Sequence, residues 1–261
     1  MSTRVGERRA RHGIFIAPFE ELSEPRAAAD LAARTEERGW DGFFVWDHVA
    51  YAPPVQALAD PWITLAAVAL ATERVTIGPL VTPLPRRRTH QLARETTTID
   101  RLSGGRLVLG VGIGSGRTGE FDPERFGEEG DARERARMLD EGLERLGAYW
   151  AGEFEPRPVQ EPRVPVWVAV GWPNRRPLRR AARWDGVFPI DMPGPEALAE
   201  IVAEVRELRE PGAGDFEVVV TNPAGTDPEP WIEAGATWCL TGFGSQPTKR
   251  EVLEAIDARD A

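Results

Sequence analysis

Short apolar runs alternate with longer segments of helical periodicity along most of the chain. The runs are continuously apolar, which is typical of parallel strands that helices cover on both faces. They lie at residues 14–16, 43–46, 75–77, 107–109, 166–170, 187–188, 218–220 and 239–240. Between them, start signals such as Ser23 before Pro25 and Asp60 before Pro61 predict helices. The pattern therefore predicts eight strand-helix units that share one parallel sheet.

Chain length favours closing this sheet into a barrel. A (β/α)8 barrel of the TIM type needs about 250 residues, and the chain has 261. We therefore predict a single barrel domain over residues 13–261, with residues 1–12 as a disordered, arginine-rich tail. The proline-rich segment 152–165 is predicted to be a short insertion before strand five, folded as a small hairpin beside the pocket.

Composition excludes several kinds of partner. A formal net charge of -10 argues against nucleic acid and anionic membrane surfaces, since binding to both needs clustered cations. No apolar stretch approaches the ~20 residues that span a bilayer. Cys239 is the only cysteine, so we expect no intrachain disulfide and a reducing cytoplasm as the compartment. His12, His48 and His90 form no metal-binding motif, and no metal site is expected.

The loop after the second apolar run has the most reactive side chains. Barrel enzymes build their sites from loops that follow the strands, and Trp46, Asp47, His48 and Tyr51 stand in that position. Histidine changes its protonation near neutral pH, so His48 could donate a proton or hydrogen-bond to a ring cofactor. The alternative is a structural histidine that is tied to Asp47 or to the backbone.

Two glycine-containing turns follow later strands. Residues 110–116 alternate glycine with other residues, which suits either close approach of a flat or anionic ligand or tight barrel packing. They do not match the G-x-G-x-x-G dinucleotide fingerprint. Residues 171–176 lead into a segment with Arg179 and Arg180, which predicts either a phosphate-binding turn or a solvated cationic face.

A set of sequence blocks resembles the luciferase-like monooxygenase superfamily between Gly13 and Asp191. The blocks are ERGWDG at 37–42, WDH at 46–48, DPW at 60–62, TERVTIG at 72–78, LARE at 92–95, DRLSGGRLVLGVG at 100–112, PVWV at 165–168 and RWDG at 183–186. The resemblance implies a TIM-type barrel that holds FMN or the deazaflavin coenzyme F420. It further implies hydride transfer or oxygen insertion on a small organic substrate.

The resemblance also assigns roles to individual residues. Asp47 and His48 match the catalytic pair beside the flavin ring, and Leu80-Val81 falls where many members have a cis peptide bond. The cofactor-binding residues that it implies are Leu80, Val81, Thr82, Gly112, Gly114, Val170, Gly171, Trp172, Asn174, Arg175 and Arg176. The substrate pocket would include Phe19, Trp46 and Tyr51. Ser115 stands where sugar-phosphate dehydrogenases of the deazaflavin group have a glutamate, which argues against that activity.

The function that we expect is therefore a flavin-dependent oxidoreductase or monooxygenase. If the cofactor is FMN, NAD(P)H or a partner flavin reductase would supply the electrons, and the reduced flavin would react with oxygen. If the cofactor is F420, hydride transfer is expected. The resemblance implies a homodimer. The alternative is a noncatalytic flavin-binding or assembly subunit, which an occluded strand mouth would favour. The sequence does not distinguish FMN from F420 and does not identify the substrate. Loops 115–131 and 152–165 are expected to determine substrate specificity.

Overall fold

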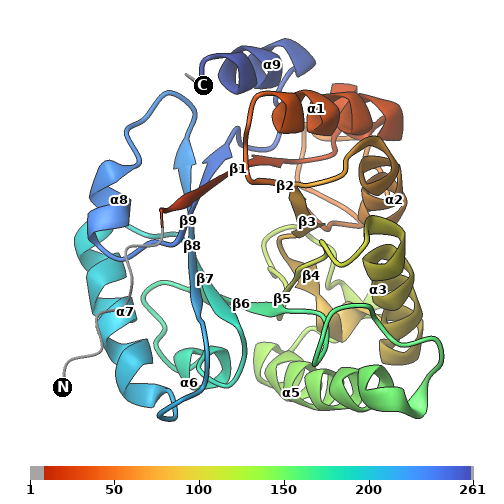
Figure 1. Ribbon diagram of the computed structural model, residues 1–261. Helices are drawn as coiled ribbons and strands as arrows, with labels where there is room; N and C mark the ends of the chain where they lie inside the picture. Colours follow the sequence, from red (N-terminus) through yellow and green to blue (C-terminus); the bar gives the residue numbers. More distant parts are fainter. Residues whose placement is uncertain (1–8, 260–261) are drawn as a thin grey trace.

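Parallel strands form a nearly closed barrel, and helices surround it (Figure 1). The computed structural model describes residues 9–259. The strands are β1 (Arg11–Ile16), β2 (Gly42–Val45), β3 (Thr76–Pro79), β4 (Thr82–Pro83), β5 (Leu109–Gly112), β6 (Val166–Gly171), β7 (Gly186–Ile190), β8 (Glu217–Pro223) and β9 (Trp238–Gly242). The α-helices are α1 (Pro25–Glu37), α2 (Pro61–Ala71), α3 (Thr89–Ser103), α4 (Pro123–Phe126), α5 (Ala132–Ala148), α6 (Leu178–Ala181), α7 (Pro195–Leu208), α8 (Glu229–Glu233) and α9 (Lys249–Asp257). None of these helices combines the length and the apolar composition that crossing a membrane requires.

The barrel closes at a strand that is broken in two. The strand order is β3-β2-β1-β9-β8-β7-β6-β5-β4, so the sheet begins and ends with segments that are separated in the chain only by Leu80 and Val81. The Ile77 amide donates to the carbonyl of Arg106 over 3.0 Å, and the Val108 amide donates to the carbonyl of Ile77 over 2.9 Å. β3 and β4 thus share one of eight positions around the barrel, and the predicted (β/α)8 fold is confirmed.

Two glycines allow the backbones to meet at this closure. A Cβ atom on Gly78 would lie 2.1 Å from the carbonyl oxygen of Val108, and one on Gly110 would lie 2.5 Å from that of Pro79. Real Cβ atoms do not approach a backbone oxygen so closely, and a backbone cannot move aside as a flexible side chain can. The close contact between β3 and β5 therefore depends on glycine at both positions.

Aromatic side chains fill the amino-terminal half of the barrel. The rings of Phe44, Trp167 and Trp238 lie with centroids 5.6 Å apart in each pair. Trp167 and Trp238 stand at the start of their strands, and all three side chains are buried. A separate and larger apolar layer packs between the strands and the helices. Within residues 9–259, these side chains plug the amino end of the barrel, and open space is left at the carboxyl ends of the strands.

Several local predictions need correction. Segment 152–165 contains no strand, and it lies at the amino end of the barrel: the Val159 amide donates to Asp100 on α3, and Gln160 donates to the carbonyl of Leu107. The predicted hairpin beside the pocket is therefore wrong, because a loop that precedes a strand lies at the end opposite the site. Asp60 caps α2 as predicted, whereas the Ser23 hydroxyl donates to the carbonyl of Glu20 and caps no helix.

The predicted amino-terminal tail overlaps the first strand. β1 begins at Arg11, inside the segment 1–12 that the sequence assigned to the tail. Residues 1–8 lie outside the described residues.

Candidate active site

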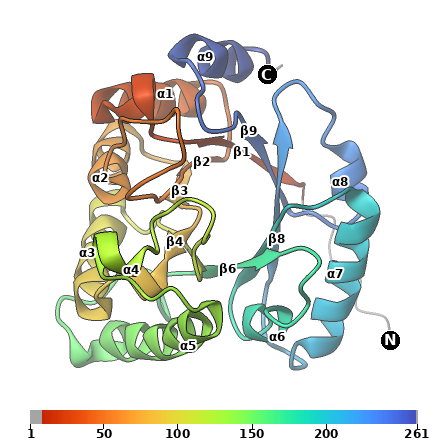
Figure 2. The ribbon, with the colours of Figure 1, turned by 180° about the vertical axis from the view of Figure 1, so that it is seen from behind.

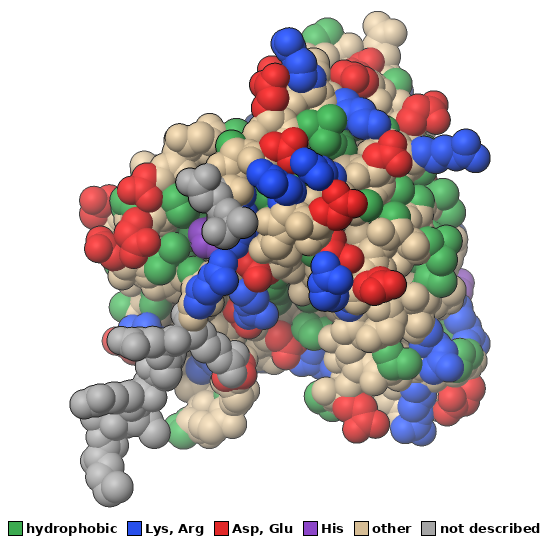
Figure 3. All heavy atoms as spheres, turned by 45° about the horizontal axis from the view of Figure 1, so that its top comes forward, with side chains coloured by type: hydrophobic (Ala, Val, Ile, Leu, Met, Phe, Trp, Pro, Cys, Tyr) green, Lys and Arg blue, Asp and Glu red, His purple; other side chains and the backbone are tan. Residues whose placement is uncertain are grey.

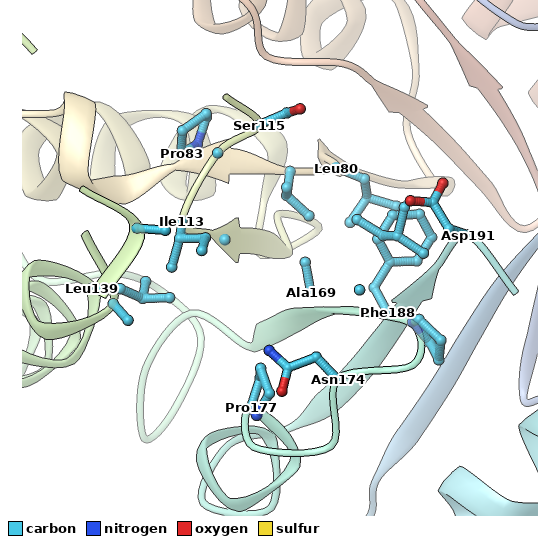
Figure 4. Close-up of a pocket in the computed structure, with 18 of the residues that line it drawn as sticks. Leu80, Pro83, Ile113, Ser115, Leu139, Ala169, Asn174, Pro177, Phe188 and Asp191 are labelled. Atoms are coloured by element: carbon cyan, nitrogen blue, oxygen red, sulfur yellow. The ribbon is translucent and has the colours of Figure 1, made fainter. Parts of the chain in front are cut away.

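A cavity of about 1260 Å³ opens at the carboxyl ends of the strands. Its floor is apolar, with Leu80 from the break between β3 and β4, Ala169 from β6 and Phe188 from β7 (Figure 4). Ile113 and Leu139 lie on one side of the space, and Asn174 and Pro177 lie on another. Figure 2, which views the ribbon from behind, shows α4 and its flanking loop beside β4. Ligand sites are commonly about 300–1,000 Å³, so this cavity has room for a tricyclic ring and a further molecule.

His48 and Glu120 form a hydrogen-bonded pair at the cavity wall. His48 Nδ1 lies 2.9 Å from Glu120 Oε2, and the Val49 amide donates to the same oxygen over 3.4 Å. Glu120 is fully buried, and its other oxygen, Oε1, has no hydrogen-bond partner within residues 9–259. With Nδ1–H donating to this carboxylate, the remaining nitrogen of His48 is the acceptor. The pair can therefore take a proton from a bound molecule and return it.

Asp47 is turned away from the cavity into a buried charge network. Its carboxylate accepts from the Thr82 hydroxyl over 2.8 Å, from Arg86 Nη2 over 2.6 Å and from Arg87 Nη2 over 2.9 Å. The side chain of Asp47 is 0% exposed, and those of Arg86 and Arg87 are 8% and 17% exposed. The network ties the loop after β2 to the segment after β4, so Asp47 and Thr82 hold the wall of the site in place.

Aromatic rings continue the wall around His48. Tyr51 lies 5.1 Å from the His48 ring and 5.2 Å from the Phe19 ring, and Trp46 lies 5.8 Å from the His48 ring. Trp46 and Tyr51 line the cavity, whereas Phe19 is fully buried behind them. This packing fixes the position of the imidazole next to the apolar floor.

The floor has a flat surface of small and aliphatic groups. The peptide bond between Leu80 and Val81 is cis, as the resemblance implied, and both residues line the cavity. A Cβ atom on Gly112 would lie 3.2 Å from Val81 and 3.3 Å from Ala169. Glycine at this position therefore keeps side-chain atoms off the floor of the cavity. Such a surface suits a planar ring.

Backbone conformation and packing explain why residue 114 is a glycine. Its φ is +77°, and a Cβ atom there would lie 2.0 Å from the ring of Phe121. The residue lines the cavity, but packing and backbone conformation already account for glycine at this position.

The family follows from a comparison with known proteins. The model of the luciferase-like monooxygenase family matches residues 9–230. The chain belongs to this family. The predicted resemblance is confirmed.

The names of curated and solved relatives of this luciferase-like protein mention two cofactors, F420 and FMN. An F420-dependent glucose-6-phosphate dehydrogenase of Nocardia farcinica is 32% identical over 180 residues, which cover 61% of this chain and 51% of that protein. This chain therefore spans about half the length of that relative. An F420-dependent secondary alcohol dehydrogenase, solved with an F420-acetone adduct, has a TM-score of 0.76 at 19% identity and covers 97% of this chain and 100% of its own. The oxygenating constituent of 3,6-diketocamphane monooxygenase of Pseudomonas putida, solved with FMN, has a TM-score of 0.66 at 17% identity and covers 84% of this chain and 69% of its own.

The turn after β6 differs from the phosphate-binding turn that was expected in this luciferase-like chain. The amides of Trp172, Asn174 and Arg176 donate to the carbonyl of Ile190, the carbonyl of Gly171 and the Asn174 side chain. Gly171, Asn174 and Arg176 line the cavity, whereas Trp172 does not. Three main-chain amides of this segment are therefore already hydrogen-bonded, and the exposed side chain of Arg176 is the cation that it offers to the cavity.

Other predicted cofactor residues also lie outside the lining of the cavity. Arg175 pairs with Glu200 and Glu204 of α7, which draws its guanidinium away from the space. Val170 is buried in the layer between strands and helices. Alternation along β6 explains the latter, since Ala169 and Gly171 face the cavity and Val170 faces the other side.

Sequence reasoning missed Glu120. The residue belongs to the loop 115–131, where Ser115 was noted because it is not a glutamate. The structure brings a carboxylate to His48 from five positions further along the same loop. Several acidic residues follow in this loop, and nothing in their spacing indicates which one turns inward. A buried acid is visible only once the loop has folded back over β2 and β5.

Proposed function

We propose that this protein is a flavin- or deazaflavin-dependent oxidoreductase that acts on a small organic substrate. The observation that carries the proposal is the His48–Glu120 pair beside an apolar floor large enough for a tricyclic ring. Family membership and relatives named for F420 or FMN support it. When bound, such a ring accepts or donates a hydride, and FMN in addition allows reaction with oxygen.

The residues of this chain have distinct tasks in the proposal. Leu80, Val81, Gly112 and Ala169 support one face of the ring and exclude water from it. His48 takes or returns the substrate proton that accompanies the two-electron change, because its free ring nitrogen is an acceptor while Glu120 holds Nδ1.

Glu120 and Asp47 act through other residues. The Glu120 carboxylate stabilises the imidazolium that forms when His48 is protonated. Asp47 positions the His48 loop through Arg86 and Arg87 and does not contact the substrate.

The noncatalytic alternative is a flavin-binding or assembly subunit. That function would be favoured by a mouth that side chains occlude, or by loss of the histidine. The cavity is open and keeps His48 together with Glu120, which supports the enzyme.

Purified protein titrated with FMN and, separately, with F420 tests the proposal through fluorescence quenching. We expect one of the two rings to bind with micromolar affinity or better, and the bound ring to be reduced or oxidised on addition of a suitable partner. A protein that binds neither FMN nor F420 would contradict the proposal. A homodimer, a partner flavin reductase and a cytoplasmic location stay predictions; light scattering in solution tests the first.

A further inference from the structure

A second hollow of about 760 Å³ lies next to the active-site cavity, at the carboxyl ends of β8 and β9. Phe15, Trp46 and Thr221 line both spaces and therefore form a wall that the two share. The ring of Trp46 lies 5.8 Å from the ring of His48, between centroids. A molecule that reaches over this wall can have one end beside His48 and the other end in the second hollow, whose volume is that of an ordinary ligand site.

The two spaces differ in charge. Six arginines and three carboxylates line the active-site cavity. Within residues 9–259, no arginine or lysine lines the second hollow, and its charged residues are Glu251 and Glu254 of α9. Figure 3 shows acidic and basic side chains interspersed on one outer face, so the lack of cations in the hollow is a local feature. A carboxylate or phosphate bound there would meet only like charges.

A buried amide adds a free hydrogen-bond acceptor to the hollow. Asn222, which lines it, is 7% exposed, and its Nδ2 donates to the carbonyl of Thr226 over 3.2 Å and to the Thr226 hydroxyl over 2.8 Å. Because a carbonyl only accepts, the amide nitrogen must face Thr226 and Oδ1 must face elsewhere. Oδ1 accepts no hydrogen bond within residues 9–259 and is open to solvent. The hollow therefore offers a fixed acceptor to a ligand that donates.

One of the two carboxylates is also held in place. The Thr248 amide and hydroxyl donate to Glu251 Oε2 over 2.8 Å and 2.7 Å at the start of α9, which leaves Oε1 without a hydrogen bond in the described part of the chain. Glu254 follows on the same helix, with Arg250 at 3.9 Å as a weak partner. The remaining lining includes apolar groups that suit a chain of methylenes, namely Pro223, Ala224, Phe243, Ala255 and Ala258.

We propose that the second hollow binds the ammonium group of an amine-bearing substrate whose reacting end lies beside His48. This inference rests on the proposed function and deepens it, because it names a class of substrate. Asn222 Oδ1 accepts a hydrogen bond from the ammonium group, and Glu251 and Glu254 supply the opposite charge. The methylenes between the two ends of the substrate cross the wall formed by Phe15, Trp46 and Thr221.

A pair of alcohols tests this inference by isothermal titration calorimetry. Aminooctanol, with its two groups at opposite ends of the chain, is compared with octanol, which lacks the amine, at low and at high salt. We expect aminooctanol to bind about tenfold more tightly at low salt, through two exposed ion pairs and one hydrogen bond. The preference should shrink at high salt, because exposed charges are screened.

Variants assign the preference to the hollow. The double substitution Glu251→Gln with Glu254→Gln should reduce the preference to about threefold or less, and glutamine at 251 can still accept from the Thr248 amide. Asn222→Ala should weaken aminooctanol binding by about threefold and leave octanol binding unchanged. The charge-matched control is Glu207→Gln with Glu210→Gln, two exposed acids in and just after α7 that lie outside the hollow; it should keep the full preference.

The outcomes separate this inference from the proposed function. Aminooctanol that binds no more tightly than octanol would refute the inference. A preference that survives in the Glu251 and Glu254 double variant would also refute it, since the amine would then lie elsewhere, for example beside Glu120. Both results leave the proposed function intact if FMN or F420 binds. If neither ring binds while the preference depends on these glutamates, the proposed function fails, the hollow is an amine site, and its ligand is not a redox substrate.

Discussion

Replacing Asp47 by asparagine should destabilise the protein strongly, because the change removes the buried carboxylate that both the Arg86 and the Arg87 guanidinium groups contact. The carboxylate is 0% exposed and accepts from both Arg86 and Arg87, whose side chains are 8% and 17% exposed. Asparagine can still accept from the Thr82 hydroxyl but carries no charge. Removing one partner of a buried ion pair costs about 3–5 kcal/mol. Natural domains are stable by only about 5–15 kcal/mol, so this is a large fraction of the total.

Urea unfolding followed by circular dichroism measures this free energy. We expect Asp47→Asn to lower the free energy of unfolding by about 3–5 kcal/mol, and the melting temperature by roughly 10 °C for a domain of this size. The control is Asp30→Asn, since Asp30 is exposed and pairs with Lys249 at the surface; it should change stability by less than about 1 kcal/mol. An Asp47→Asn variant that is as stable as the control would show that the network does not hold the site wall.

Three further predictions concern the site and the barrel. Glu120→Gln should lower turnover by about 10²-fold or more while His48 stays in place, because a neutral amide stabilises the imidazolium poorly; steady-state kinetics check this, and an unchanged rate rejects the assigned role. Gly78→Ala should lower the free energy of unfolding by at least ~1–3 kcal/mol through its clash with the Val108 carbonyl, whereas Gly147→Ala, with no atom within 4 Å inside α5, should raise it by about 0.5–1 kcal/mol; urea unfolding separates the two signs. Burial raises the pKa of the Cys239 thiol to about 12, so at pH 8 Ellman's reagent should label the unfolded protein quickly and the native protein hardly at all; rapid labelling of the native state would contradict this packing.

Features of the fold that depend on local pattern could be predicted from the sequence. Continuous apolar runs gave the order and the parallel sense of the strands, since burial on both faces demands such runs. Asp60 before Pro61 located the start of α2, because a carboxylate there accepts from the first free amides. The cis peptide bond between Leu80 and Val81 was accessible only through the family resemblance.

Features that depend on long-range contacts could not be predicted in the same way. Glu120 reaches His48 across 72 positions of the chain, and Arg175 is drawn away from the cavity by acids on α7. The hairpin predicted for segment 152–165 was placed beside the pocket although its position before a strand assigns the segment to the amino end of the barrel. For Glu120 and Arg175 the deciding partner lies in another strand-helix unit, so no local spacing indicates it.

The central claim is that a planar redox ring lies on the floor made by Leu80, Val81, Gly112 and Ala169. Titration of the Ala169→Phe variant with the ring that the unaltered protein binds tests this claim most directly, because the added side chain would occupy the floor. We predict that binding is lost, or weakened by about 10²-fold or more, while the unfolding curve shows that the barrel remains folded. A folded Ala169→Phe variant that binds the ring as tightly as the unaltered protein would contradict the account.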